Sequence, residues 1–218
     1  TAATRIYEWK DQLVINSTRK VSFFTRDGRL LSERRISGQG QNFMPVPGGY
    51  LGIGRAVDGE TMYLTIELLD ADFKTLREMG RFAFMHDRKL NFFSAIRTLG
   101  FTARRDTLYV VGEEGFSIHI CDLKGNILKT VTEEYEPVKV TEEDRQDFLE
   151  AIKSTLPDPS VFERIKNMFA FPRVYPEIMM LQMSGDVLIA YTWKKRGEEF
   201  EIYFYNADGG FIKKAFVS

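Results

Sequence analysis

Two side chains with metal-binding chemistry occur close together in the middle of the chain. His119 and Cys121 lie two residues apart in the alternating segment Ser117–Cys121, so both point to one face if this segment is a strand. Imidazole and thiolate are ligands of zinc and other soft metals. A structural zinc site needs four ligands, however, and His86 is the only other histidine of the sequence. We therefore expect a small buried cysteine beside a hydrogen-bonded histidine, and no metal.

A second set of polar residues comes from four separate strands. Glu8, Asn42 and Glu177 offer oxygen ligands that would suit Ca²⁺, whereas the guanidinium of Arg104 would oppose a cation. The four residues match no known motif, and solvated charges at strand ends are the expected alternative. We assign no catalytic, metal or cofactor-binding residue from sequence.

Other catalytic and phosphate-binding signatures are absent from the sequence. No G-x-S-x-G element for a nucleophilic serine occurs. The glycine pairs at 38–40 and 52–54 are too short for a phosphate-binding loop and are not followed by a helical pattern.

Charge and composition exclude several classes of protein. Among 218 residues, 30 Lys and Arg nearly balance 31 Asp and Glu, which argues against a nucleic-acid binder. No apolar run approaches the ~20 residues that a membrane span requires. One cysteine forms no internal disulfide and gives no indication of redox compartment. Because the chain begins Thr-Ala-Ala-Thr without Met, we expect a processed or trimmed chain or a fragment.

A fourfold repeat predicts how these residues are positioned. Each unit has a strand centred on a Leu, then a strand, a tight turn of the Asx-Gly type and another strand. The aligned turn positions are Gly28, Phe73, Gly125 and Gly209. The first three follow one another at about the 40–50-residue period of four-stranded propeller blades, and an insertion precedes the fourth.

The repeat predicts an all-β fold, a β-propeller of four-stranded antiparallel blades. The innermost strands are expected at 6–9, 43–46, 101–103 and 179–183. Alternating apolar residues such as Ile118 and Ile120 would pack between blades. Gly52 and Gly54 are expected to allow close packing at the ring axis. The predicted blades are approximately 5–36, 42–80, 99–132 and 176–216, with a helical insertion at 133–175.

Two helices are expected in the insertion. Thr141 is a predicted N-cap before three acidic residues, and apolar residues then recur at helical spacing to about Ser154. Asp158 is the predicted N-cap of a second helix, with Pro159 at its first position.

Two segments outside the repeat are candidate partner-binding sites. The apolar stripe of the second helix either covers a propeller face or contacts a partner, and the sequence leaves both possibilities open. A basic and aromatic interruption at 81–98 would bind an acidic or aromatic ligand, or would be an ordered loop packed by its own Phe residues. The candidate residues are Val161, Phe162, Ile165, Phe169, Arg88 and Phe92.

Two stretches resemble a known family. YEPVKVTEEDRQDFLEAI (135–152), after the strand pair at 106–131, and the ending VYPEIMMLQMSGDVLIAYTWKKRGEEFEIYFYNADGGFIKKAF (174–216) resemble bacterial six-bladed β-propeller proteins of the TolB/NHL-like group. The resemblance covers 100–218 well and 5–80 only through the repeat. It implies a periplasmic or extracellular protein, and most members have no assigned reaction. Because we count four repeats, either two blades are missing or the ring is four-bladed. A gap would expose core edges and favour self-association.

The function expected from sequence is a non-enzymatic propeller scaffold that binds a protein or a small ligand. The alternative, implied by a resemblance to calcium-dependent sugar lactonase propellers, is a metal-dependent hydrolase or lactonase acting in the central channel. We expect no cofactor, no nucleic-acid partner and no membrane span, with a protein partner or self-association open.

Overall fold

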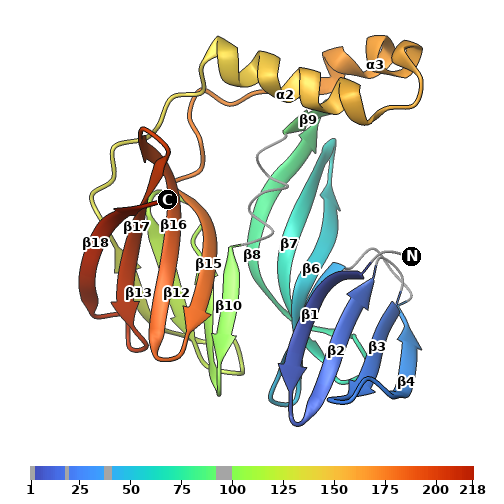
Figure 1. Cartoon of the computed structure of the whole chain (residues 1–218), viewed down its shortest axis with the longest axis vertical. Helices are drawn as coiled ribbons and strands as arrows, with labels where there is room; N and C mark the ends of the chain where they lie inside the picture. The colour runs from blue at the N-terminus through green and yellow to red at the C-terminus, as the bar shows by residue number, and fades with distance from the viewer. Residues whose placement is uncertain (1–2, 18–19, 37–40, 92–99) are drawn as a thin grey trace.

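The computed structural model describes residues 3–17, 20–36, 41–91 and 100–218, and in these residues the strands form four sheets (Figure 1). The first and third sheets are antiparallel and four-stranded, with strands in chain order. We call them blades 1 and 3. Blade 1 consists of β1 (Ala3–Trp9), β2 (Gln12–Ser17), β3 (Lys20–Thr25) and β4 (Leu30–Arg35). Blade 3 consists of β10 (Phe101–Arg104), β11 (Thr107–Val111), β12 (Ser117–Cys121) and β13 (Ile127–Thr132).

The last repeat forms blade 4, again with four antiparallel strands in chain order. Its strands are β15 (Ile178–Ser184), β16 (Val187–Arg196), β17 (Glu199–Asn206) and β18 (Phe211–Val217). The all-β class that the repeat predicts is confirmed.

Blade 2 departs from the prediction because it has six strands. Four are β5 (Gln41–Val46), β6 (Gly49–Asp58), β7 (Thr61–Asp70) and β8 (Thr75–His86). β8 continues through the first part of the expected interruption at 81–98, because the long β7 pairs with it as far as His86. A short β9 (Lys89–Asn91) turns back on β8, and β14 (Phe169–Ala170), from the helical insertion, adds in parallel to β9.

The four aligned turns have one geometry. The backbone φ is +89° at Gly28, +63° at Phe73, +77° at Gly125 and +79° at Gly209. In each turn the backbone amide of this residue donates to the carbonyl oxygen of the residue three positions earlier, with nitrogen–oxygen distances of 2.9–3.1 Å. Phe73 adopts a conformation that usually selects glycine, and its ring stacks on Tyr50 at 4.3 Å. Because all four turns share this backbone geometry, Phe73 aligns with the glycines of the other three turns.

The hydrophobic core lies between the blades. One cluster joins blades 2, 3 and 4 and includes Ile66, Val110, Ile118 and Leu188. A smaller cluster joins blades 1 and 2 through Val14 and its neighbours. Gly52 and Gly54 lie on β6, not at the axis as predicted: added Cβ atoms would meet Phe43 and Glu67 of the same blade. The close approach is therefore within blade 2.

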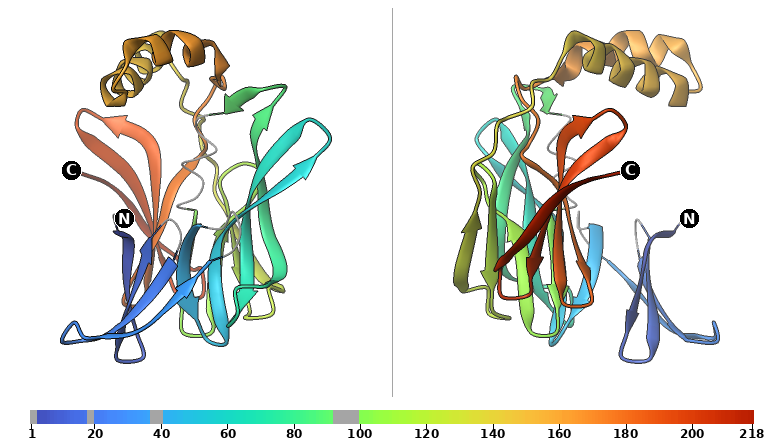
Figure 2. Two further views of the ribbon diagram at one scale, coloured as in Figure 1. Left: turned by 90° about the vertical axis from the view of Figure 1, so that its right-hand side faces the viewer. Right: turned by 60° about the vertical axis from the view of Figure 1, so that its left-hand side comes forward.

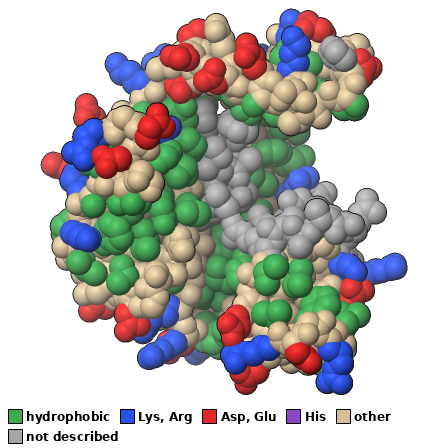
Figure 3. Space-filling model, in the orientation of Figure 1, with side chains coloured by type: hydrophobic (Ala, Val, Ile, Leu, Met, Phe, Trp, Pro, Cys, Tyr) green, Lys and Arg blue, Asp and Glu red, His purple; other side chains and the backbone are tan. Residues whose placement is uncertain are grey.

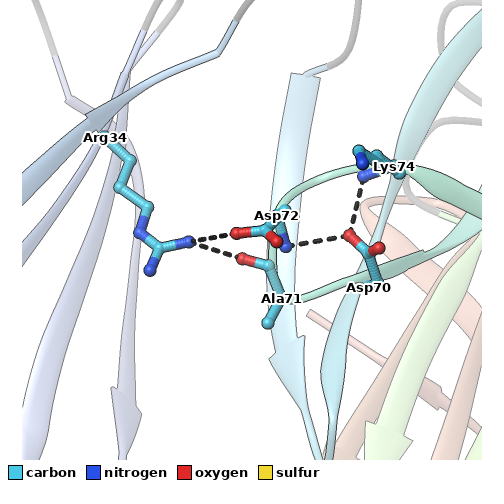
Figure 4. A network of polar contacts seen from close by, with 5 residues as sticks. All are labelled: Arg34, Asp70, Ala71, Asp72 and Lys74. Atoms are coloured by element: carbon cyan, nitrogen blue, oxygen red, sulfur yellow. Dashed lines mark hydrogen bonds and ion pairs between the residues drawn. The ribbon is translucent and has the colours of Figure 1, made fainter.

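Blades 1 and 2 are also joined by a polar contact at the hairpin turn of blade 2 (Figure 4). Arg34, on β4, donates from Nη1 to the carbonyl oxygen of Ala71 at 2.7 Å and to Asp72 Oδ1 at 3.2 Å. Asp70 Oδ1 holds the turn by accepting from the backbone amides of Asp72 and Lys74. We call such a contact, from a basic side chain on the fourth strand of one blade to the hairpin turn of the next, an inter-blade latch.

The inter-blade latch recurs along the ring. Arg77 of β8 donates to the Lys124 carbonyl at 3.3 Å and to Asn126 Oδ1 at 3.0 Å, in the turn of blade 3. Lys129 of β13 donates to the Asp208 carbonyl at 2.9 Å, in the turn of blade 4. Blades 1, 2 and 3 therefore each hold the turn of the blade that follows.

The helical insertion lies over one end of the blades (Figures 1 and 2). It contains α2 (Glu142–Thr155), α3 (Pro159–Ile165) and a 3₁₀ turn, η2 (Lys166–Met168). Thr141 caps α2 in a capping box with Asp144, and Asp158 caps α3 with Pro159 in its first turn, as predicted. Because β14 pairs with β9, the insertion is fastened to blade 2 although it lies between blades 3 and 4 in the sequence.

Candidate functional site

The innermost strands of the four blades line a cavity of about 690 Å³. Each blade contributes its innermost strand. These are β1 of blade 1, β5 of blade 2, β10 of blade 3 with the turn that follows it, and β15 of blade 4. The lining residues are Ile6, Tyr7, Glu8, Trp9, Met44, Pro45, Phe101, Thr102, Ala103, Arg105, Met180, Leu181, Gln182 and Met183. We call this cavity the central pocket.

The lining of the central pocket combines apolar and polar chemistry. Most side chains are aromatic, aliphatic or thioether groups, and the polar ones come from three blades: Glu8, Thr102, Arg105 and Gln182. Glu8 forms an ion pair with Arg26. This set suits an organic ligand with an apolar body and one or two polar groups. Aromatic faces such as that of Trp9 also attract cations.

Of the four polar candidates from the sequence, the three whose side chains are described lie in different places. Glu8 lines the central pocket. Arg104 instead holds blade 4, donating to the Gly185 carbonyl at 3.2 Å and pairing with Asp186. Glu177 lines a separate small hollow between blades 3 and 4. The side chain of Asn42 lies outside the described residues, so its place in the set stays a prediction.

Cys121 is buried and His119 is hydrogen-bonded, as expected from the sequence. His119 Nδ1 lies 3.0 Å from Thr130 Oγ1 on the neighbouring strand. Cys121 is buried in the core, and this burial raises the pKa of its thiol to about 11. His86 is on blade 2, where its Nδ1 lies 2.7 Å from Thr61 Oγ1. In the part of the chain that is described, no three His, Cys, Asp or Glu residues cluster to hold a metal ion.

The candidate partner-binding residues fall into different environments. Phe162 is buried, below the ammonium group of Lys153, whereas Val161 and Ile165 are half-buried on α3. Phe169 packs edge-on against Phe148 of α2, with ring centres 5.3 Å apart. These contacts show that part of the apolar stripe packs within the insertion.

The second candidate segment meets the first. Arg88 is exposed in the turn between β8 and β9, with a φ of +58°. Leu90, two residues later, pairs with Phe169 across the β9–β14 contact. Phe92 lies outside the described residues. Sequence reasoning treated the two segments separately, and in the structure the parallel β9–β14 pairing brings them together.

Sequence reasoning did not select the residues that dominate the central pocket. Trp9, Met44, Arg105 and Met183 belong to no motif, since their shared property is a position on or beside an innermost strand. The predicted innermost strands were the available signal. They would have identified the lining without indicating which side chains enclose a cavity.

Comparison with known proteins gives the fold and nothing finer. No family model and no curated protein matches the chain. Among solved structures, an exported protein of Bacteroides fragilis superposes with a TM-score of 0.55 at 12% identity, over 99% of this chain and 57% of that one. Hsv2 of Kluyveromyces lactis gives 0.44 at 9% identity, over 97% and 50%. BamB of Moraxella catarrhalis gives 0.37 at 12% identity, over 95% and 46%.

The fold is a β-propeller. The four sheets of the described residues are its blades, and the chain spans about half the length of the solved structures that it matches. In the described residues, no helix has the length and apolarity needed to cross a membrane.

Proposed function

We propose that this propeller is a non-enzymatic scaffold whose central pocket binds a small ligand or a short segment of a partner protein. The observation that carries the proposal is the size and lining of the pocket. A cavity of about 690 Å³ lies within the range of about 300–1,000 Å³ typical of ligand sites. Such sites combine a mainly apolar lining with a few polar groups, as here with Glu8, Arg105 and Gln182.

The enzymatic alternative has no observation in its favour. A calcium-dependent hydrolase would place several carboxylate or amide oxygens at about 2.3–2.6 Å from one point. Among the described lining residues, Glu8 contributes a carboxylate and Gln182 an amide, and both lie near apolar neighbours. Binding without chemistry is therefore the better-supported function.

Three finer expectations stay predictions. They are membership of the TolB/NHL-like group, a six-bladed ring and a periplasmic or extracellular location. Their support is the sequence resemblance of residues 100–218. The propeller fold is compatible with all three and selects none of them.

We also keep the helical insertion as a proposed partner-docking surface. Val161 and Ile165 are half-buried on α3, and Arg88 is exposed on the blade 2 hairpin that is fastened to the insertion. A partner with an apolar strip beside an acidic group would suit this combination. The central pocket is the stronger candidate because all four blades contribute to it.

The pocket proposal is tested by filling the cavity. The probes are phenylacetate and phenethylamine, an aromatic carboxylate and an aromatic amine that match the polar groups Arg105 and Glu8. We expect at least one of them to raise the melting temperature of the wild-type protein, and Met183→Trp to remove the shift. Leu128→Trp, at an exposed position on β13, is the matched control and should keep it.

Two results would refute binding in the central pocket. One is that neither probe, nor a wider set of aromatic and aliphatic acids and amines, stabilises the wild-type protein. The other is that a stabilising compound acts equally on Met183→Trp and on the wild type.

A further inference from the structure

The two ends of the row of blades each carry a blade face that no neighbouring blade of the described structure covers. Strand pairing sorts the side chains of blade 1 into two faces. Val14, Val21 and Phe23 face blade 2 and pack in the cluster there. Ile6 and Ile15 point to the other side, and Ile6 is 62% exposed.

The outer face of blade 1 is apolar around these residues. Leu13 pairs with Phe24 across β2 and β3, and both are half-buried on the same side as Ile15. The hairpin turn of blade 1 projects beside this face. An added Cβ at Gly28, in the turn, would have no atom within 4 Å. We call the face and its turn the blade 1 end.

Blade 4 shows the complementary arrangement. Leu188 and Tyr205 face blade 3 in the core, so Ile189 and Phe204, which alternate with them and pair with each other, face outward. Both are half-buried. Figure 3 shows hydrophobic side chains gathered over this part of the surface. We call it the blade 4 end.

The blade 4 end carries a lysine, Lys213, at the position of an inter-blade latch donor. Lys213 is four residues after Gly209, as Lys129 is after Gly125 and Arg77 is after Phe73, whereas the donor of blade 1, Arg34, is six residues after Gly28. Lys213 pairs across the strands with Phe204, as Lys129 does with Ile120. In the described residues Lys213 has no hydrogen-bond partner, and its ammonium group lies 5.2 Å from the Phe204 ring centre. It therefore occupies the donor position of a latch whose turn is missing.

The blade 1 end offers the missing turn. In the latches to blades 3 and 4, the turn glycine is tightly enclosed by the preceding blade. An added Cβ at Gly125 would lie 2.7 Å from Arg77 Cδ, and one at Gly209 would lie 2.5 Å from Ile120 Cδ1. Gly28 has the same positive φ but open space around it. The blade 1 turn is a latch acceptor without a donor.

We propose that the chain self-associates head to tail, with the blade 4 end of one copy covering the blade 1 end of a second copy. Lys213 of the first copy then donates to the 25–28 turn of the second, and Phe204 and Ile189 pack on Phe24, Leu13 and Ile15. Two copies supply eight blades, within the four to eight that propellers use, so we expect a closed dimer. This inference does not depend on ligand binding in the central pocket.

Two interfering substitutions and their mixture form the test. Phe204→Asp blocks the blade 4 end, and Phe24→Asp blocks the blade 1 end. Sedimentation velocity over a range of concentrations is expected to show a dimer for the wild type and a monomer for each variant. An equimolar mixture should regain association, because one intact contact remains between a Phe24→Asp and a Phe204→Asp molecule. A face-to-face dimer of two identical ends would instead survive in one of the variants.

Lys213→Ala is the milder variant, since its side chain is exposed and its loss leaves the core intact. A closed dimer loses two such exposed contacts, at about 0.5–1 kcal/mol each, so association should weaken about fivefold to thirtyfold. Lys124→Ala, an exposed lysine in the turn of blade 3, is the matched control and should have no effect. A wild-type protein that stays monomeric at about 100 μM, or an association that persists in Phe204→Asp or in Phe24→Asp, overturns the proposal. The monomer would favour further blades of a longer polypeptide as the cover of both ends.

Discussion

Arg77 of blade 2 reaches across the blade boundary and donates from Nη1 to Asn126 Oδ1 in blade 3, at 3.0 Å. Asn126 is itself held by Asp122, whose carboxylate accepts from its side-chain and backbone amides. The side-chain bond from Asn126 is the largest of the effects that lower the pKa of Asp122. The turn is therefore a preorganised acceptor for the arginine.

The Arg77–Asn126 contact should be measurable as a coupling energy. In a double-mutant cycle of Arg77→Ala and Asn126→Ala, we expect a coupling of about 0.5–1 kcal/mol, because the contact is solvent-exposed. Urea unfolding provides the free energies. Arg88→Ala paired with Asn126→Ala is the control and should be additive. Additive effects in the first cycle would show that the latch does not join the blades energetically.

Two glycines with the same backbone geometry should respond differently to alanine. Gly28→Ala introduces strain at positive φ, worth about 1 kcal/mol. Gly209→Ala adds an overlap with Ile120 and Val131, which we expect to cost about 1–3 kcal/mol more. Unfolding should be followed at dilute, monomeric protein. Equal losses of stability at the two sites would contradict the packing of the blade 4 turn against blade 3.

Cys121 should make stability fall at alkaline pH. Burial raises the pKa of its thiol to about 11, above the value of about 8.5 in unfolded chains. The unfolded state therefore loses its proton first, and the associated stability is present below about pH 8.5 and lost as the pH rises toward 11. We expect the wild type to lose about 2 kcal/mol more than Cys121→Ala between pH 8 and 11. Parallel pH profiles for the two proteins would show that the thiol is not buried.

The capping box of α2 should stabilise the helix locally. Thr141→Ala removes the side-chain oxygen that accepts from the Asp144 amide, a loss of about 1 kcal/mol. Hydrogen exchange of residues 142–155 should become faster by about fivefold. Thr155→Ala, at the other end of the helix, is the control and should change the exchange little. Unchanged exchange in Thr141→Ala would mean that packing of Phe148, and not the cap, holds the helix.

The sequence contained the local signals of this fold but few of its long-range contacts. Positive φ at Gly28 and Gly125 followed from the turn residues, and the cap at Thr141 followed from its acidic neighbours. The β9–β14 pairing was not predictable, because Leu90 and Phe169 are nearly eighty residues apart and each strand is too short to show a pattern. Secondary-structure propensity therefore indicates neither of the two strands.

The candidate site was likewise predictable only in part from the sequence. The innermost strands were predictable from the repeat, yet the central pocket depends on which side chains of four distant strands leave space between them. Arg104 and Arg105 illustrate this. They are adjacent in sequence, but Arg104 holds blade 4 and Arg105 lines the pocket. Strand alternation places neighbouring residues on opposite faces, but it does not indicate which of the two borders a cavity.

The most direct test of ligand binding in the central pocket uses Trp9 as a reporter. The only other tryptophan, Trp193, stacks on Tyr175 at 4.5 Å and is not a lining residue, so Trp193→Phe leaves one reporter in the cavity. We expect a compound that stabilises the protein to change Trp9 emission at saturation, with a binding curve that Met183→Trp abolishes when followed by calorimetry. Stabilisation without any change in Trp9 emission would place the ligand elsewhere and contradict the account.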